Sequence, residues 1–283
     1  MLADAVDLLA CPHCGAGLEL DTPESTAAEL VCERGHTFDV ARQGYVSLLP
    51  GSAGKIVGDS ADMVAARGDF LDSGHYDPLM SAVADAVAES PAVGRVLDVG
   101  VGTGHYLARI LDTSTETTGL GIDVSKAAAR RAARAHPRIA SVVADVWQQL
   151  PVRAGVIDVV TSVFSPRNTA ELRRVLRDDG RLVVLTPTEH HLEELVGALG
   201  LVRVDSEKNR RLGDSMAGVF ERVSRRPVTF TVSMDHRAIE GVVAMGPSAR
   251  HISPAERSDQ IRSLPDPFAV TVSVVIGVYV VVR

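Results

Sequence analysis

Hydrophobic positions between residues 95 and 186 come in short continuous runs, and the stretches between these runs are mixed in polarity. The runs cover residues 95–99, 118–122, 139–144, 156–164 and 181–186. Such runs predict buried strands, and the mixed stretches predict helices, the first of which begins near His105. Regular alternation of strand and helix predicts an α/β fold with a doubly wound, Rossmann-like parallel sheet.

The same periodicities predict further elements on both sides of this region. The predicted helices cover residues 60–71, 77–89, 169–176, 235–243 and 254–263. The predicted strands are a short one at 37–40, one at 228–232 and a valine-rich one at 270–282. His190 and His191 follow Pro187 and are predicted to begin another helix. Proline and glycine are frequent between residues 50 and 60, which predicts a flexible linker there.

A glycine-rich turn follows the first of the central strands. Gly100, Gly102 and Gly104 let the backbone turn tightly and approach a ligand closely. A dinucleotide-binding protein also has such a turn, but its spacing is G-x-G-x-x-G rather than the G-x-G-x-G found here. Asp98, two residues before the first glycine, suits the cationic amino and sulfonium groups of S-adenosylmethionine and would repel a pyrophosphate. The turn therefore favours S-adenosylmethionine and disfavours a nicotinamide-dependent dehydrogenase.

Two more aspartates stand at strand ends. Asp123 ends the second strand, where a carboxylate can accept hydrogen bonds from both ribose hydroxyls of the cofactor. Asp145 follows the third strand, from where it can bond the adenine amino group. Each aspartate alone could be an ordinary turn or N-cap residue. Together with Asp98 and the glycine turn, they predict a cofactor crevice at the carboxyl ends of the strands.

All three cysteines lie in the first 32 residues and predict a metal site. Cys11 and Cys14 form a C-x2-C pair, and Cys32 and His36 form a C-x3-H pair seventeen residues later. Three thiolates and one imidazole make a closed tetrahedral zinc site, which is structural rather than catalytic. A redox C-x-x-C motif would leave Cys32 and His36 without a role. His13 could replace His36 as a ligand, but its place between two coordinating cysteines disfavours this.

Charge and hydropathy restrict where the protein works. The net charge is −7, which argues against nonspecific coating of nucleic acid, although residues 126–138 carry five basic residues and no acid. This basic run is either a solvated helix face or an RNA contact. The acidic first ten residues are unlike a secretory leader, and the C-terminal apolar run is too short for a membrane helix. A cytoplasmic location without a membrane partner is expected.

Several longer motifs together resemble one enzyme family over nearly the whole chain. They are the Cys and His pairs of the metal site, residues 36–46 (HTFDVARQGYV), 62–67 (DMVAAR), 71–76 (LDSGHY), 130–138 (RRAARAHPR), 144–147 (ADVW) and 243–248 (VAMGPS). The chain resembles the 23S rRNA guanine-N1 methyltransferases, and within them the actinomycete branch that includes the tylosin-resistance methyltransferase. This resemblance implies a class I methyltransferase fold with an N-terminal zinc-binding module.

The resemblance also implies roles for particular residues. The zinc ligands are Cys11, Cys14, Cys32 and His36, and the implied cofactor contacts, beyond those already named, are Tyr76, His105, Tyr106, Leu107 and His191. Arg34 and Arg42 in the zinc module are candidates for RNA contact, together with Arg130, Arg134 and Arg167. Residues 165–168 (SPRN) lie where methyltransferases of this fold present substrate-orienting groups. They do not match the N/D-P-P-Y/F motif of enzymes that methylate exocyclic amines.

The domains and the reaction follow from these assignments. We expect a zinc-binding module at residues 1–50, a linker and connecting helix at 51–75, and a methyltransferase domain at 76–283. The expected reaction transfers a methyl group from S-adenosylmethionine to N1 of a guanine in a 23S rRNA hairpin at the peptide exit tunnel, with macrolide resistance as a further consequence. The expected partner is 23S rRNA or the large-subunit precursor, and a homodimer stays open. The alternatives are a small-molecule methyltransferase and a non-catalytic RNA-binding protein.

Overall fold

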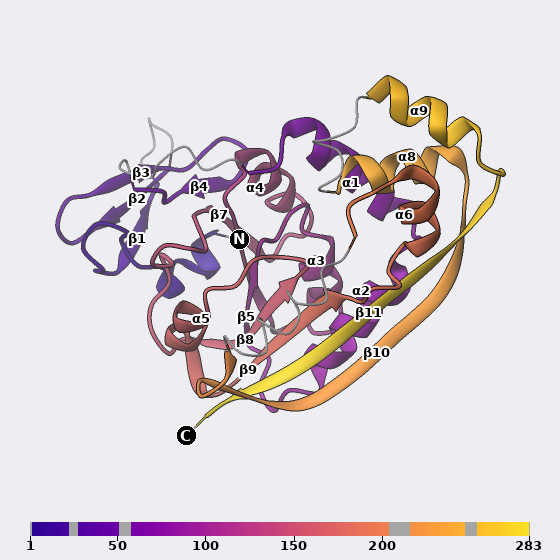
Figure 1. Cartoon of the computed structure of the whole chain (residues 1–283). Coiled ribbons are helices and arrows are strands. Elements are labelled where there is room, and N and C mark those ends of the chain that lie inside the picture. Colours follow the sequence, from indigo (N-terminus) through magenta and orange to yellow (C-terminus); the bar gives the residue numbers. More distant parts are fainter. Residues whose placement is uncertain (1, 23–27, 51–57, 204–215, 247–253, 283) are drawn as a thin grey trace.

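A single mixed sheet forms the centre of the computed structural model, which describes residues 2–22, 28–50, 58–203, 216–246 and 254–282. Its eight strands run in the order β10-β11-β9-β8-β5-β6-β7-β4 (Figure 1). They are β4 (Tyr45–Ser47), β5 (Arg95–Val99), β6 (Thr118–Asp123), β7 (Ile139–Val143), β8 (Ile157–Val163), β9 (Leu176–Pro187), β10 (Phe220–Met234) and β11 (Phe268–Val281). The predicted α/β class is confirmed.

Strand direction divides the sheet into two parts. The strands from β4 to β9 pair in parallel, whereas β11 runs antiparallel to both β9 and β10. The chain reverses its direction of travel across the sheet at β5, since β6 and β7 lie on one side of it and β8 and β9 on the other. Such a reversal leaves a crevice at the carboxyl ends of the parallel strands, and open α/β sheets bind their ligands in that crevice.

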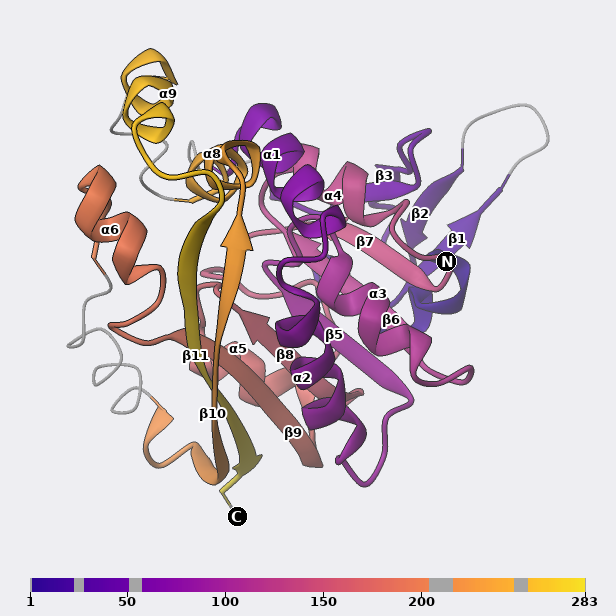
Figure 2. The same cartoon turned by 90° about the vertical axis from the view of Figure 1, so that its right-hand side faces the viewer.

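Helices cover the sheet on both faces. They are α1 (Ala61–Asp72), α2 (Asp77–Ala88), α3 (His105–Asp112), α4 (Lys126–Ala132), α5 (Thr169–Val175), α6 (Glu193–Leu199), α8 (His236–Ala244) and α9 (Pro254–Arg262). Figure 2 shows α2 and α3 in front of the central strands and α5 behind them. Neighbouring strand residues enter opposite cores, as Val96 packs with α2 and α3 while Leu97 packs with α5.

The N-terminal module contains a small sheet of its own and also extends the large one. Strands β1 (Leu18–Asp21), β2 (Glu29–Cys32) and β3 (Thr37–Asp39) form an antiparallel sheet, and β4 pairs in parallel with β7. Leu8, Leu9 and Leu30 lie in the same core as α5. The module therefore shares its interior with the rest of the protein. The predicted division at residues 50 and 75 stays a prediction, and residues 51–57 of the predicted linker lie outside the described residues.

Three predicted elements differ from the structure. β10 is much longer than the predicted 228–232, because its exposed and half-buried positions alternate and give only a weak hydrophobic signal. The strand predicted at 156–164 ends one residue earlier, at Val163, and Phe164 leaves it with a left-handed φ of 51°. His190 and His191 precede the helix that they were predicted to begin, because α6 starts at Glu193, after a left-handed Leu192.

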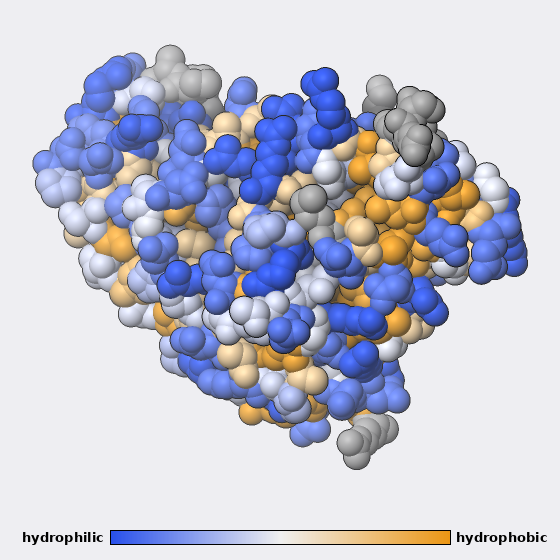
Figure 3. All heavy atoms as spheres, turned by 180° about the vertical axis from the view of Figure 1, so that it is seen from behind, coloured by the Kyte–Doolittle hydropathy of each residue, from blue (hydrophilic) through white to orange (hydrophobic). Residues whose placement is uncertain are grey.

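Among the described residues, no helix is long and apolar enough to cross a bilayer. Figure 3 shows the rear of the molecule, where hydrophilic side chains cover most of the face and hydrophobic ones gather beside the N-terminal module.

Candidate functional site

The glycine turn lies between β5 and α3 and is held against β6. The backbone N–H groups of Gly100 and Val101 both donate to the carbonyl of Ile122, at 2.8 and 3.0 Å. Gly100 has a φ of 72°, and a Cβ there would come within 2.5 Å of the Cβ of Ser165. Only glycine fits this position, because the loop after β8 packs directly on the turn. Gly102 and Gly104 also have positive φ angles.

Asp98 is buried at the base of the turn. One carboxylate oxygen accepts a hydrogen bond of 2.8 Å from the hydroxyl of Thr161 on β8. Burial and, to a smaller extent, nearby Asp123 raise the pKa of Asp98 to about 7, although the hydrogen bond from Thr161 lowers it. A buried carboxyl group with a pKa near neutrality is poised to ionise when a cation arrives. This fits the amino and sulfonium groups predicted to lie beside it.

The other two aspartates occupy neighbouring strand ends, as predicted. Asp123 accepts hydrogen bonds from the backbone N–H groups of Gly102 (2.9 Å) and Ser125 (2.8 Å), so it ties the glycine turn to the start of α4. Burial raises its pKa, and these two hydrogen bonds lower it. Asp145 is buried and accepts one hydrogen bond of 3.0 Å from the backbone N–H of Trp147. The structure thus places all three acidic residues at the carboxyl ends of the neighbouring strands β5, β6 and β7.

Tyr76 and His191, which are 115 residues apart in sequence, contact each other on the same side of the sheet as the strand carboxyl ends. The Tyr76 hydroxyl lies 3.3 Å from Nε2 of His191, and the backbone N–H of Ser273 donates to Nδ1 of the same ring. Burial lowers the pKa of His191 to about 4, so the ring is neutral at pH 7. The network therefore assigns the ring proton to Nε2, which donates to the Tyr76 oxygen. This leaves the Tyr76 hydroxyl proton free to point at a ligand.

A buried hydroxyl without a partner supports a cofactor at this place. Among the described residues, the hydroxyl of Tyr106 has no hydrogen-bond partner although it is buried. Its pKa is raised by burial and by the nearby Tyr76 and Asp98, while Arg67 lowers it. Buried polar atoms normally find a partner, and a bound molecule with polar groups would supply one. The Leu107 side chain, in contrast, is fully buried in the core, and its predicted cofactor contact stays a prediction.

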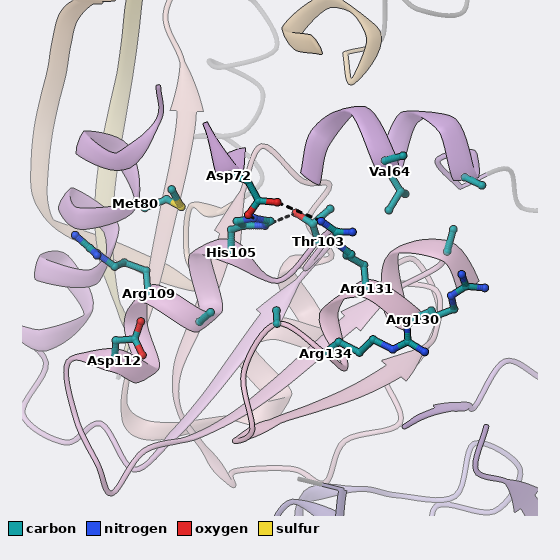
Figure 4. Close-up of a pocket in the computed structure, with 15 residues that line it drawn as sticks. Val64, Asp72, Met80, Thr103, His105, Arg109, Asp112, Arg130, Arg131 and Arg134 are labelled. Carbon is teal, nitrogen blue, oxygen red and sulfur yellow. Dashed lines mark hydrogen bonds and ion pairs between the residues drawn. The ribbon is translucent and has the colours of Figure 1, made fainter. Parts of the chain in front are cut away.

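His105 turns away from this group of residues and lines a groove on the helical face. Its ring bonds Thr103 (2.8 Å) on one side and Asp72 (3.0 Å) on the other, and Asp72 also pairs with Arg131 (3.2 Å). The groove has a volume of about 690 Å³ and is lined by α1, α3 and α4. Figure 4 shows Arg130 on α4 and Arg134 in the turn after it, both extending along the groove. The arginine groove, defined by Arg109, Arg130, Arg131 and Arg134, is thus a basic surface beside the cofactor crevice.

The four predicted metal ligands converge in the N-terminal module. The Sγ atoms of Cys11, Cys14 and Cys32 and a ring nitrogen of His36 all lie within 4.8 Å of one another. A tetrahedral zinc ion with bonds of about 2.3 Å to sulfur holds two thiolates about 3.8 Å apart. The Sγ atoms of Cys14 and Cys32 are 3.8 Å apart, and Nδ1 of His36 lies 3.6 Å from Sγ of Cys11 and 3.3 Å from that of Cys32. The types of these four residues and the distances between them fit a bound zinc ion.

Local chemistry supports a thiolate at Cys32, whereas burial raises the pKa of the Cys11 thiol. Burial raises the pKa of the Cys32 thiol, but hydrogen bonds from the backbone of His36 and Arg34 and from neighbouring side chains lower it to about 6. A thiol that ionises near neutral pH is a ready metal ligand. His13 is outside the cluster and stacks instead on Phe38, with ring centroids 5.8 Å apart. The geometry of the cluster agrees with the predicted preference for His36 over His13, and the ligand assignment stays a prediction.

Comparison with known proteins identifies the family. A family model described as a methyltransferase domain matches residues 96–180, and a zinc-ribbon model described as RlmA, N-terminal, matches residues 9–54. A 23S rRNA (guanine(748)-N1)-methyltransferase from Streptomyces fradiae is 49% identical to the chain over 277 residues, which cover 97% of each protein. This chain belongs to the 23S rRNA guanine-N1 methyltransferase family. The resemblance stated from the sequence motifs is confirmed.

Further similarities agree with membership of this rRNA methyltransferase family. A protein from Micromonospora griseorubida, named for the same guanine-N1 activity on 23S rRNA, is 43% identical over 99% of both chains. A type II methyltransferase structure from Anaeromyxobacter dehalogenans superposes with a TM-score of 0.51 at 19% identity, covering 71% of this chain and 94% of its own. That likeness concerns the fold alone. The methyltransferase domain implies S-adenosylmethionine as cofactor, and the zinc ribbon with its Cys3His cluster indicates structural zinc.

Two residues of this methyltransferase lie at the crevice without having been predicted there. Arg67 of α1 reaches the glycine turn, since a Cβ on Gly102 would lie 3.6 Å from Nη1 of Arg67. Its guanidinium also pairs with Asp59 (2.6 Å) and donates to the carbonyl of Met245 (2.9 Å). Phe164 lies beside His191, with ring centroids 5.6 Å apart. Neither has a local sequence signal, because an arginine in an amphipathic helix and a phenylalanine ending a strand are both ordinary.

The predicted RNA-contacting arginines fall into three places. Arg34 lies in the turn between two zinc ligands, and Arg42 lies in the turn between β3 and β4; both are exposed. The latter turn touches α4, because a Cβ on Gly44 would lie 3.8 Å from the Cβ of Ala133. Arg42 is therefore close in the fold to the arginine groove. Arg167 is half-buried, and burial lowers its pKa.

Proposed function

We propose that this protein transfers a methyl group from S-adenosylmethionine to N1 of a guanine in the 23S rRNA hairpin that lines the peptide exit tunnel. The observation that carries the proposal is the full-length similarity to a 23S rRNA guanine-N1 methyltransferase. It is supported by the convergence of Asp98, Asp123 and Asp145 beside the glycine turn. The protein would act in the cytoplasm on the rRNA or the large-subunit precursor.

Each residue of the crevice has a proposed part in holding the cofactor. Asp98 faces its cationic end, Asp123 its ribose and Asp145 its adenine, while Gly100, Gly102 and Gly104 leave room for it. The hydroxyls of Tyr76 and Tyr106 supply donors that no described protein group uses. Arg67, beside Gly102, joins this set as a cation within reach of the methionine carboxylate. Leu107 contributes packing, and His105 fixes the start of α3 through Thr103 and Asp72.

The chemistry requires positioning and the loss of one proton. When bound, S-adenosylmethionine supplies its sulfonium methyl group: N1 bonds to that carbon, the carbon–sulfur bond breaks with its electron pair staying on sulfur, and N1 loses its proton. Both ring nitrogens of His191 are hydrogen-bonded, one to Ser273 and one to Tyr76, so His191 positions Tyr76 and does not accept the N1 proton. A carboxylate or water accepts that proton instead. Holding N1 in line with the methyl group then provides much of the rate enhancement.

Primer extension on 23S rRNA tests this function. A methyl group on N1 blocks Watson–Crick pairing, so reverse transcriptase should stop next to one guanine after incubation with protein and S-adenosylmethionine. The relative from Streptomyces fradiae is named for guanine 748, and we expect the stop there. Cofactor binding without any stop, on free rRNA or on assembled subunits, would contradict the proposal. The same modification, made in a macrolide-sensitive host, should raise macrolide tolerance.

A small-molecule methyltransferase is the second candidate and is disfavoured. A malonyl-[acyl-carrier protein] O-methyltransferase from Geobacter sulfurreducens is 39% identical, but over only 33% of this chain. That match spans 104 residues, whereas the match to the rRNA methyltransferase from Streptomyces fradiae spans 277. The oligomeric state stays open, and light scattering distinguishes a monomer of 30.0 kDa from a homodimer of twice that mass.

We expect the arginine groove to contact the phosphate backbone of the rRNA. Arg130 and Arg134 form no ion pair with the described residues, whereas Arg131 is already paired with Asp72. Arg130→Glu combined with Arg134→Glu should weaken rRNA binding roughly 10- to 100-fold and reduce the salt dependence by about two phosphate contacts. Filter binding at several salt concentrations measures both quantities.

The control for this variant reverses the same charge elsewhere. Arg222→Glu combined with Arg225→Glu changes two exposed arginines of β10, at the opposite edge of the sheet from the N-terminal module. Binding of S-adenosylmethionine should be unaffected in both double variants. Equal loss of rRNA binding in the two double variants would mean that only net charge matters. No loss in either would mean that Arg130 and Arg134 are solvated and do not contact RNA.

A further inference from the structure

Phe164 is exposed and conformationally constrained at the carboxyl end of β8. The residue is 43% exposed, which is unusual for a phenylalanine that follows a fully buried strand. Its φ of 51° lies in the left-handed region, which bulky side chains avoid. Strained residues of this kind persist only where the surroundings enforce them, and they cluster at functional sites.

Several hydrogen bonds enforce this conformation. The backbone N–H of Phe164 donates to the carbonyl of Leu185 (3.3 Å) on β9. The hydroxyl of Ser165 donates to the carbonyl of Val99 (2.6 Å) and lies 2.9 Å from the hydroxyl of Ser162. The peptide after Phe164 is thereby fastened to the last residue of β5, directly before Gly100. These bonds hold the backbone on both sides of the Phe164 ring.

The surroundings of the ring place it between the cofactor residues and solvent. Its centroid is 5.6 Å from that of His191, with an angle of 32° between the planes. His191 in turn contacts Tyr76, whose ring packs edge-on against Phe70 in the core. Phe164 is therefore the outermost ring of an aromatic row that begins in the core and passes the crevice. The part of the ring that is not covered by His191 is available to a planar partner.

We propose that Phe164 is the surface on which the target guanine stacks once it has been unstacked from the rRNA. This rests on the proposed function, and it adds the residue that receives the base. A base removed from its helix loses stacking on both faces, and an aromatic side chain restores one of them. The carboxyl end of β8 adjoins the glycine turn through Ser165, so a base stacked on this ring lies next to the cofactor crevice.

The test compares ring removal with ring replacement in the full-length protein. Phe164→Gly removes the ring and suits the left-handed backbone, so the fold is preserved and an unchanged melting transition verifies it. Stacking on one aromatic ring predicts a loss of roughly 5- to 150-fold in kcat/KM for rRNA methylation. Phe164→Leu should lose as much, since it is apolar but not planar, while Phe164→Tyr and Phe164→Trp should retain activity within a few-fold.

A second measurement separates stacking from other roles. The dissociation constant for S-adenosylmethionine, measured by calorimetry, should stay within about twofold in all four variants. A fluorescent guanine analogue placed at the methylated position of the hairpin should be quenched by wild type and by Phe164→Trp, but not by Phe164→Leu. Full activity of Phe164→Leu would overturn the proposal, and so would a parallel loss of cofactor affinity. Because the wild-type primer-extension stop is scored separately, failure here is distinguishable from failure of the proposed function.

Discussion

Replacing Asp98 with asparagine should weaken S-adenosylmethionine binding by about 100-fold or more, the usual cost of removing one charge from a buried pair. The amide keeps the shape of the side chain and its hydrogen bond to Thr161, so the fold should survive. Only the negative charge facing the cationic end of the cofactor is lost. Calorimetric titration measures the change directly, and Asp85→Asn, an exposed carboxyl on α2, serves as the control.

The same carboxyl group should make cofactor binding depend on pH. In the free protein Asp98 has a pKa of about 7, so at pH 6 most molecules carry it protonated and neutral. A bound cation favours the carboxylate, so binding below pH 7 releases a proton. Affinity should rise by up to about tenfold per pH unit toward pH 7 and then level off. Asp98→Asn should show no such slope between pH 5 and 7. An equally steep slope in that variant would assign the titration to another group.

Removal of zinc should unfold more than the small module that binds it. Cys32→Ser, or exhaustive chelation, should cost at least about 3 kcal/mol of unfolding free energy and lower the melting temperature by about 10 °C. The reason is that Leu8, Leu9 and Leu30 belong to the core beneath the large sheet. Loss of the ion would open that core to water. Differential scanning calorimetry together with metal analysis measures the effect.

His13→Ala is the matched control for the zinc prediction. His13 lies between two ligands in sequence and beside His36 in space, with ring centroids 5.0 Å apart, yet it is outside the cluster. This variant should retain one zinc per chain and most of its stability. Loss of the ion from His13→Ala would reassign the fourth ligand. An unchanged melting temperature in metal-free Cys32→Ser would instead show that the core holds the module without it.

The parts of the site that could be predicted are those that depend on local spacing. Glycines at fixed intervals after a strand, and aspartates at strand ends, are positioned by the strand itself and by parallel pairing. The zinc ligands were predictable for a similar reason, because each pair of ligands is joined by a short turn. In these cases the sequence separation already determines the distance in space.

The parts that could not be predicted depend on distant packing. Arg67 reaches Gly102 only because α1 crosses the sheet edge, and nothing in the sequence of a helix shows which way an arginine will point. Phe164 continues the hydrophobic run of the strand before it, so the sequence predicts it as part of that strand. Its exposure results from the hydrogen bond between the Ser165 hydroxyl and the Val99 carbonyl. The hydrogen bond between Tyr76 and His191 likewise exists only in the folded chain.

The pairing of β4 with β7 joins the metal module to the cofactor crevice through a continuous backbone ladder. Val46 and Ser47 pair with Val142 and Val143, and Asp145 follows two residues later. An rRNA that shifts the zinc module would therefore also shift the strand that positions Asp145. Thermodynamic linkage makes such an effect reciprocal. We therefore expect the two substrates to be coupled, so that rRNA changes the affinity for the cofactor by the same factor by which the cofactor changes the affinity for rRNA.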